Sequence, residues 1–308
     1  MSKTVREKKT ISIIIPSFNY VTYLGRAIES IINQTYTHWE LIIVEDGSSD
    51  GSLELAKDYE KKDKRIKVIF HSDHANNGLS KTLRLGLSHT QADWVAFLES
   101  DDWLEPTYLE DKIAKSYDNK CDCIVNYIKL EAEDGCDLSW QLSYVPRVLS
   151  YIEEKSKDDD PENKLSIDIL KENLIPTFSC VMIRRSLLEK LSWDTPVEQW
   201  LDWFLWAQLF QIAHVRVLPK ELTHWRIHKS SFNRKKSISN YLRDYRSFRS
   251  SIKSRLECLD LTDRSVKIKI LDSSGFLLLG RRCFLAFKSK GIVPVLSQIL
   301  SRLGLKNV

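Results

Sequence analysis

The first hundred residues alternate between two hydrophobic periodicities, and this alternation limits the possible folds more than any other feature. Short β-branched and apolar runs predict buried strands at 11–15, 41–44, 66–70 and 94–98. Apolar residues at helical spacing predict helices between them, at 23–34, 52–60 and 79–88. Such alternation requires right-handed crossovers, so we expect an α/β, Rossmann-like fold with a mainly parallel sheet covered by helices on both faces.

Two acidic clusters follow predicted strands at the point where each strand ends. Glu45 and Asp46 follow the second strand, and Glu99, Asp101 and Asp102 follow the fourth. In an open parallel sheet, ligands bind in the crevice beyond the carboxyl ends of the strands. We therefore expect the two clusters to converge on one site, although a single Asp at such a position can also be a helix cap.

Several well-known nucleotide and metal motifs are missing from the sequence. There is no GxGxxG after a strand, no GxxxxGK[ST] and no HExxH. This disfavours dehydrogenase, P-loop and zincin functions. Clustered carboxylates with few soft ligands suit Mg²⁺ or Mn²⁺, which in turn can neutralise a diphosphate.

The order of motifs resembles family 2 glycosyltransferases of the GT-A fold, of the bacterial polysaccharide type. The resemblance runs from about residue 11 to residue 228 and rests on ISIIIPSFNYVTYLGRAIESIINQTYTHWELIIVEDGSSDGS, NGLSKTLRLGL and WVAFLESDDW, followed by VEQWLDWFLW and LTHWRIHKSS. It implies a metal-dependent, inverting transfer of a sugar from a nucleotide-diphosphate donor, most simply a UDP-sugar, to a glycan or lipid-linked glycan. The metal implied is Mn²⁺ or Mg²⁺.

The resemblance also assigns roles to residues of this chain. Asp46 corresponds to the acid that recognises the nucleotide base, and Glu99-Ser100-Asp101 corresponds to the DxD element, with Asp101 as the metal ligand. The ending LTHWRIHKSS makes His228 a second metal ligand, although a lone histidine is more often structural. The full donor set implied is Pro16, Ser17, Asn19, Asp46, Lys81, Glu99, Ser100, Asp101 and Arg226. This sequence departs from the usual Asp at both Glu45 and Glu99.

The segment VEQWLDWFLW resembles the family's EDWDLW block, in which an Asp removes the proton of the acceptor hydroxyl. Alignment on the shared DW and LW places that role on Asp202, and Glu198 is the alternative. Burial near tryptophans would raise the pKa of such a carboxylate toward the useful range. Five tryptophans surround this block, and we expect one or two of them to face a sugar and the rest to pack: Trp193, Trp200, Trp203, Trp206 and Trp225.

Charge divides the chain. Residues 231–308 hold 17 Lys and Arg against 5 Asp and Glu, a formal charge of +12, whereas residues 1–230 carry −8. We expect a catalytic domain over 1–230, with a donor half at about 1–130 and an acceptor half at about 131–230, and a basic helical region over 231–308. Basic amphipathic helices can lie on anionic membranes or dock on the catalytic domain; no nucleic-acid motif accompanies the charge.

Other features indicate a cytoplasmic protein, peripheral on the inner face of the membrane if the basic helices bind it. The polar residues 1–9 precede no signal-like apolar stretch, and the six cysteines form no CxxC pair and are expected to be free thiols. Two alternatives to a glycosyltransferase are a non-catalytic nucleotide-sugar or glycan-binding protein and a sugar nucleotidyltransferase. The second would need a Gly-rich basic loop after the first strand, which PSFNYVTYLGRA lacks.

Overall fold

The computed structural model describes residues 9–118, 120–157, 164–229 and 238–258. The chain divides into two compact units, Met1–Lys236 and Ser237–Val308. All strands of the described residues lie in the first unit, and the described part of the second is a single helix. The division of residues 1–230 into donor and acceptor halves stays a prediction.

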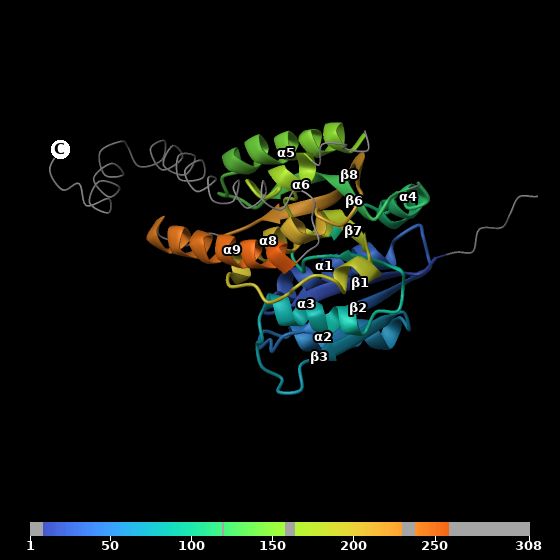
Figure 1. Cartoon of the computed structure of the whole chain (residues 1–308). Helices are drawn as coiled ribbons and strands as arrows, with labels where there is room; N and C mark the ends of the chain where they lie inside the picture. Colours follow the sequence, from blue (N-terminus) through green and yellow to red (C-terminus); the bar gives the residue numbers. More distant parts are fainter. Residues whose placement is uncertain (1–8, 119, 158–163, 230–237, 259–308) are drawn as a thin grey trace, which may run out of the picture. The chain divides into compact units, whose positions relative to one another are not determined.

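An eight-stranded sheet runs through the described part of the first unit, in the order β3-β2-β1-β4-β7-β6-β8-β5 (Figure 1). Its strands are β1 (Ile11–Ser17), β2 (Trp39–Glu45), β3 (Ile66–Phe70), β4 (Trp94–Phe97), β5 (Trp103–Leu104), β6 (Cys123–Ala132), β7 (Val181–Arg184) and β8 (Val215–Ile227). The first four strands pair in parallel, β7 is antiparallel to β4 and β6, and β8 is parallel to β6. The predicted α/β class and the four predicted strands are confirmed, and the sheet as a whole is mixed.

The helices of the first unit connect these strands. They are α1 (Val21–Ile32), α2 (Ser52–Lys62), α3 (Leu79–Ser88), α4 (Tyr108–Lys115), α5 (Ser139–Lys157), α6 (Lys164–Asp168), α7 (Arg185–Leu188) and α8 (Leu201–Leu209), with the 3₁₀ turns η1 (Phe178–Cys180) and η2 (Glu198–Trp200). The first three occupy the ranges that the sequence predicts, within two residues at each end.

The parallel half is covered on both faces because side chains alternate along β1. Ile13 and Ile15 point to one face and share a hydrophobic cluster with Ile28 of α1. Ile14 points to the other face, where α3 approaches so closely that a Cβ on Gly86 would lie 2.6 Å from the Ile14 Cγ2. Helices therefore lie on both faces, as predicted.

The carboxyl ends of three strands meet at one edge of the sheet. Ser17, the last residue of β1, pairs with Glu45, the last residue of β2, and the Ser17 carbonyl accepts a 2.9 Å hydrogen bond from the Asp46 N–H. On the other side, the Leu98 N–H donates to the Ile14 carbonyl at 3.0 Å. The loops that carry both acidic clusters thus leave the sheet side by side.

The second unit is described over α9 (Ile238–Cys258), a helix that lies within the predicted basic helical region 231–308. Its buried side chains recur at helical spacing: Tyr245, Phe248, Ile252 and Leu256. The rest of that predicted helical region, residues 231–237 and 259–308, lies outside the described residues. Among the described helices, none has the length and apolar character needed to cross a membrane. The cysteines of the described residues are free, as predicted: Cys121, Cys123, Cys136, Cys180 and Cys258.

Candidate functional site

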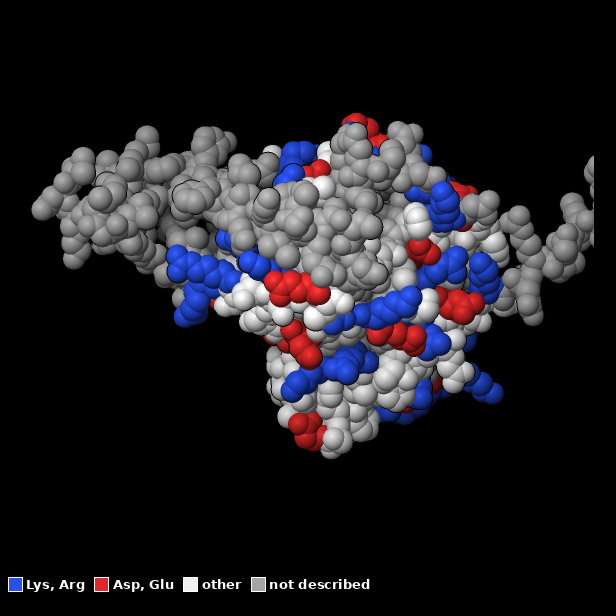
Figure 2. Space-filling view, in the orientation of Figure 1, with Lys and Arg blue, Asp and Glu red and all other residues white. Residues whose placement is uncertain are grey.

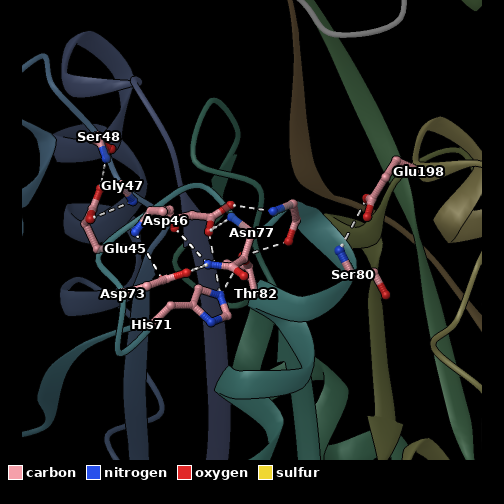
Figure 3. Close-up of polar contacts among 12 residues, drawn as sticks. Glu45, Asp46, Gly47, Ser48, His71, Asp73, Asn77, Ser80, Thr82 and Glu198 are labelled. Carbon is pink, nitrogen blue, oxygen red and sulfur yellow. Dashed lines mark hydrogen bonds and ion pairs between the residues drawn. The ribbon is translucent and has the colours of Figure 1, made fainter.

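The carboxylate of Glu45 closes the turn that follows β2. It accepts hydrogen bonds from the backbone N–H groups of Gly47, at 3.0 Å, and Ser48, at 2.6 Å (Figure 3). Gly47 has φ of 81°, and a Cβ there would lie 2.7 Å from the Asn76 backbone nitrogen, so only glycine fits. These bonds explain why a buried strand can end on a negative charge: the Glu45 oxygens are satisfied by the turn.

Asp46 joins the same turn to the loop that precedes α3. Its Oδ1 accepts a hydrogen bond from the Asn77 N–H at 2.7 Å and its Oδ2 accepts one from the Gly78 N–H at 3.0 Å (Figure 3). The Nε2 of His71 lies 3.6 Å from Oδ1. Asp46 is only 4% exposed. Its contacts join the turn after β2 to the loop before α3 and to His71, at the position predicted to recognise the base.

The loop after β1 lies against this turn. Asn19 accepts a hydrogen bond from the Ser49 N–H at 2.8 Å through its side chain, and its own N–H donates to the Ser48 Oγ at 2.9 Å. The Oγ of Ser17 is buried and has no hydrogen-bond partner. Pro16 precedes it in β1, so the predicted residues of the first strand end do lie beside Asp46.

The side chain of Glu198, the alternative candidate for the base, extends from η2 to the start of α3. Its Oε2 accepts a 3.4 Å hydrogen bond from the Ser80 N–H (Figure 3). Burial raises the pKa of Glu198, the charge of Asp46 raises it further, and Lys81 lowers it. Glu198 and Lys81 thus lie near one helix start, and Lys81 itself is exposed.

A second polar group forms where β4 ends. Thr177 donates a hydrogen bond to the Glu99 carboxylate at 2.5 Å, and the Ser179 hydroxyl donates to Asp102 at 2.6 Å while accepting from the Glu99 N–H at 3.0 Å. Asp102 also accepts from the Arg226 N–H at 3.0 Å. Thr177 and Ser179 thereby bind the acidic loop to the segment before β7.

Asp101 lies against His228 in the same group. The Asp101 Oδ2 is 2.9 Å from the His228 Nε2, and the Arg226 Nε donates to the Asp101 carbonyl at 2.8 Å. His228 is fully buried, with its ring 4.8 Å from that of Tyr23 and 5.8 Å from that of Tyr20. The two residues that the sequence analysis assigns to a metal are therefore in direct contact.

The acidic loop carries more negative charge than its surroundings neutralise. Burial, and then the charge of Asp101, raise the pKa of Glu99 to about 8. Burial together with Asp101 and Glu99 raises the pKa of Asp102 well above its usual range. Burial and Asp101 likewise raise the pKa of Tyr20. A cation bound here would relieve this repulsion.

Asp202 lies in the first turn of α8 and is half-buried. Asn173 donates a hydrogen bond to its Oδ2 at 2.9 Å, and the Trp203 N–H donates to its Oδ1 at 2.6 Å. Burial raises the pKa of Asp202 to about 6, and its charge contributes to the raised pKa of Glu99. Asp202 therefore belongs to the same electrostatic site as the acidic loop.

Lys112, which belongs to no motif, stabilises the backbone next to this site. Its side chain is fully buried, and Nζ donates to the carbonyls of Cys180 at 2.8 Å and Ile124 at 2.9 Å. Burial lowers the pKa of Lys112 to about 7. Because Cys180 ends η1, the lysine holds in place the turn that presents Ser179.

The structure gathers most of the predicted residues in two neighbouring groups. The first contains Ser17, Asn19 and Asp46; the second contains Glu99, Ser100, Asp101, Arg226 and His228. Tyr20 links them, because it follows Asn19 in the chain and its ring lies beside that of His228. Five contributors lie outside the motifs and were not predicted: His71, Lys112, Asn173, Thr177 and Ser179.

The tryptophans near Asp202 largely pack in the core. Trp193, Trp203 and Trp206 are buried, whereas Trp200 and Trp225 are partly exposed. The indole nitrogen of Trp203 donates to the Ile169 carbonyl at 2.6 Å. That one or two of the five rings face a sugar stays a prediction.

Comparison with known proteins supports one family. The model of "Glycosyl transferase family 2" matches residues 12–192. The chain is 28% identical to the putative glycosyltransferase EpsH of Bacillus subtilis over 97% of this chain and 88% of EpsH. It is 33% identical to the putative teichuronic acid biosynthesis glycosyltransferase TuaG of the same organism, over 47% of this chain and 56% of TuaG.

Solved structures show the same fold. The crystal structure of Staphylococcus aureus TarS, residues 1–349, in complex with UDP-GlcNAc matches 96% of this chain and 80% of that chain, with a TM-score of 0.63 and 20% identity. At that identity the likeness concerns the fold alone, and it agrees with the GT-A architecture expected from the sequence. The motifs, the shared sheet and the family match, which spans more than half of the residues, lead to one conclusion: the chain is a glycosyltransferase that belongs to family 2, of the bacterial polysaccharide type.

Proposed function

We propose that this enzyme is a metal-dependent, inverting glycosyltransferase that moves a sugar from a UDP-sugar to a hydroxyl of a glycan or lipid-linked glycan. The observation that carries the proposal is the placement of Asp202. Asn173 and the Trp203 N–H hold its half-buried carboxyl group, burial raises its pKa to about 6, and its charge acts on Glu99, two residues before Asp101. Direct glycosyl transfer needs a base whose pKa is near neutral pH and a nearby acidic site that can bind a metal ion.

The nucleotide would bind at the ends of β1 and β2. Asp46 already accepts two backbone N–H groups, but each carboxylate oxygen has a second lone pair that a base N–H can use. The unpartnered Ser17 Oγ provides another polar atom there. TarS was solved with UDP-GlcNAc, and its shared fold supports a uridine nucleotide as the first donor class to test.

The residues present fit a divalent cation at Asp101 and His228. A carboxylate oxygen and an imidazole nitrogen 2.9 Å apart have the spacing of two adjacent ligands on an ion whose bonds are about 2.1 Å. In the described part of the chain, no cluster of three or more His, Cys, Asp or Glu is suited to hold a metal. The donor phosphates and water would complete the shell, as is usual for Mg²⁺ and for Mn²⁺ in similar sites.

The reaction then follows from the positions of the protein groups. Asp202 takes the proton of the acceptor hydroxyl as its oxygen attacks the anomeric carbon, and the bond from that carbon to the nucleotide diphosphate breaks on the opposite side. The proton ends on Asp202, the new glycosidic bond has inverted configuration, and UDP leaves. When bound, the cation neutralises charge on the departing diphosphate. Arg226 lies beside Asp101 and would contact the same phosphates.

The basic second unit suggests where the enzyme works. The described turns of α9 carry five basic residues: Arg243, Arg246, Arg249, Lys253 and Arg255. Figure 2 shows blue side chains in the place that α9 occupies in Figure 1. Such a helix can bind anionic lipid, which would place the enzyme on the cytoplasmic face of the membrane next to a lipid-linked acceptor. Flotation with phosphatidylglycerol vesicles at low salt tests this, and absence of retention would remove it.

Nucleotide release tests the proposed activity directly. UDP-glucose, UDP-galactose, UDP-GlcNAc and UDP-GalNAc are each incubated with enzyme and Mn²⁺, with and without a panel of p-nitrophenyl glycosides, maltotetraose and chitotetraose. We expect one donor to release UDP, faster with one acceptor, and to release none in EDTA. Release that is indifferent to EDTA, or absent with every donor, would overturn the proposal.

A further inference from the structure

An exposed aromatic platform lies at the start of α5, in the stretch where the sequence alone shows no motif. Trp140 is 47% exposed although it is one of the largest apolar side chains of the chain. Its indole stacks on the ring of Tyr144, with centroids 4.6 Å apart and planes within 15°. Tyr144, in contrast, is buried, so the stack has one covered ring and one open ring.

The platform is held rigidly. The Asp137 carboxylate accepts hydrogen bonds from the Ser139 N–H at 2.8 Å and the Ser139 Oγ at 2.9 Å, which caps the first turn of α5. Tyr144 donates its hydroxyl proton to the carbonyl of Asn173. Trp140 therefore rests on a ring that is tied down at its far end, and it can offer a flat surface without losing much conformational entropy on binding.

The same tyrosine connects the platform to the candidate base. Asn173, whose carbonyl receives the Tyr144 hydroxyl, donates its side-chain amide to the Asp202 Oδ2 at 2.9 Å. Burial raises the pKa of Tyr144, and the charge of Asp202 adds to the rise, which agrees with their closeness. One tyrosine side chain thus spans the distance from the exposed indole to the residue that holds Asp202.

Polar groups lie at the edge of the platform. Arg147 has its guanidinium 5.8 Å from the Tyr144 ring centre and pairs with Glu172 through two bonds of 2.9 and 2.5 Å. A flat apolar ring bordered by such donors and acceptors suits a sugar, whose C–H face packs on the ring while its hydroxyls find hydrogen-bond partners. A lipid surface or a second protein copy would have less use for the charged pair.

We propose that Trp140 forms an acceptor subsite that binds a sugar ring of the saccharide chain whose hydroxyl reacts at Asp202. The inference rests on the proposed function and names where its acceptor binds. Trp140 sets acceptor affinity, and the predicted donor site at Asp46 and Asp101 is unaffected. Leu142, on the same turn of α5 and 60% exposed, lies outside the aromatic stack and serves as the matched control.

Steady-state kinetics with the most active saccharide of the panel test the subsite. Trp140→Ala raises the acceptor KM about ten-fold, which corresponds to the binding free energy that one stacked ring contributes. It leaves kcat and the donor KM unchanged. Trp140→Phe, which keeps a flat ring and its stacking on Tyr144, restores the acceptor KM to within about three-fold. Leu142→Ala behaves as wild type. An unchanged acceptor KM in Trp140→Ala overturns the proposal.

A binding measurement keeps the test independent of activity. In protein labelled with 5-fluorotryptophan, the ¹⁹F signal missing from Trp140→Phe belongs to Trp140, and it should move when the saccharides are added with UDP and Mg²⁺. A signal that does not move with any saccharide overturns the inference. The inference is also overturned if Trp140→Ala keeps the wild-type acceptor KM but no longer binds vesicles or no longer forms dimers, since Trp140 would then contact lipid or a second protein copy. Failure of the proposed function differs from both: wild type would neither bind UDP nor cleave a donor.

Discussion

The Oδ2 of Asp101 lies 2.9 Å from the Nε2 of His228, although the two residues are 127 positions apart in the chain. Strand β8 brings them together, because its residue His224 pairs with Trp103 of β5 and its Arg226 N–H binds Asp102. The acidic loop after β4 therefore receives its histidine through sheet pairing.

Asp202→Asn should lower kcat by about 10² to 10⁴, because the amide cannot accept the hydroxyl proton. Binding of UDP should remain, since Asp202 lies outside the predicted donor residues. Glu198→Gln is the matched control, because Glu198 binds the Ser80 N–H at the start of α3. Its kcat should stay within a few-fold of wild type, and the opposite ranking of the two variants would assign the base to Glu198.

The kcat of the wild type should depend on pH through Asp202. Burial raises the pKa of Asp202 to about 6, and the base works only when deprotonated. Activity should therefore rise as the pH increases through about 6 and level off above pH 7. A kcat measured under saturating substrates that is flat from pH 5 to 8 would contradict this role.

Glu99→Gln should stabilise the metal-free protein, and the gain should grow with pH. Burial and Asp101 raise the pKa of Glu99 to about 8 in the folded state, while the unfolded chain ionises near the usual value. Between these values the folded state binds more protons, so wild-type stability falls as pH rises from about 4.5 to 8. The variant escapes this loss and keeps the acceptor oxygen for Thr177.

Thermal unfolding in EDTA at pH 4.5, 6 and 8 measures the effect. The melting temperatures should be close at pH 4.5 and should differ by several degrees at pH 8, with the variant higher. A difference that stays constant over this range would mean that Glu99 ionises normally in the fold.

Two glycine substitutions should change stability in opposite directions. A Cβ on Gly86 would lie 2.6 Å from the Ile14 Cγ2 and 2.9 Å from the Val44 Cγ2, atoms of stiff β-branched side chains. Gly86→Ala should therefore cost about 1–3 kcal/mol. At Gly25, inside α1, the nearest atom is 3.7 Å away, so Gly25→Ala should gain about 0.5–1 kcal/mol. Denaturant unfolding of both variants, with wild type as reference, provides the comparison.

Local patterns account for what the sequence predicts well. The strands β1 to β4 and helices α1 to α3 follow from hydrophobic periodicity, because each is stabilised by one buried face or by burial on both sides. Glu45 and Asp46 stand out because charge at the end of an apolar run is unusual. Their structural work, which is to accept two backbone N–H groups each, was not predicted.

The remaining site residues depend on contacts between distant segments. Thr177 reaches Glu99 across 78 positions and Lys112 reaches Cys180 across 68, and neither contact leaves a periodic or spaced pattern in the sequence. Lys112 would ordinarily be expected at the surface, but two carbonyls satisfy it in the core. Trp140 is likewise visible only from its exposure and its stacking on Tyr144.

Titration calorimetry with UDP measures whether Asp101 and His228 hold a cation that binds the donor diphosphate. We expect UDP to bind wild type in Mn²⁺ and not in EDTA, and we expect Asp101→Asn and His228→Gln each to weaken binding at least ten-fold, whereas Asp202→Asn binds as wild type. Binding of UDP that is equally tight in EDTA, or unchanged in Asp101→Asn, would show that these two residues do not hold such a cation.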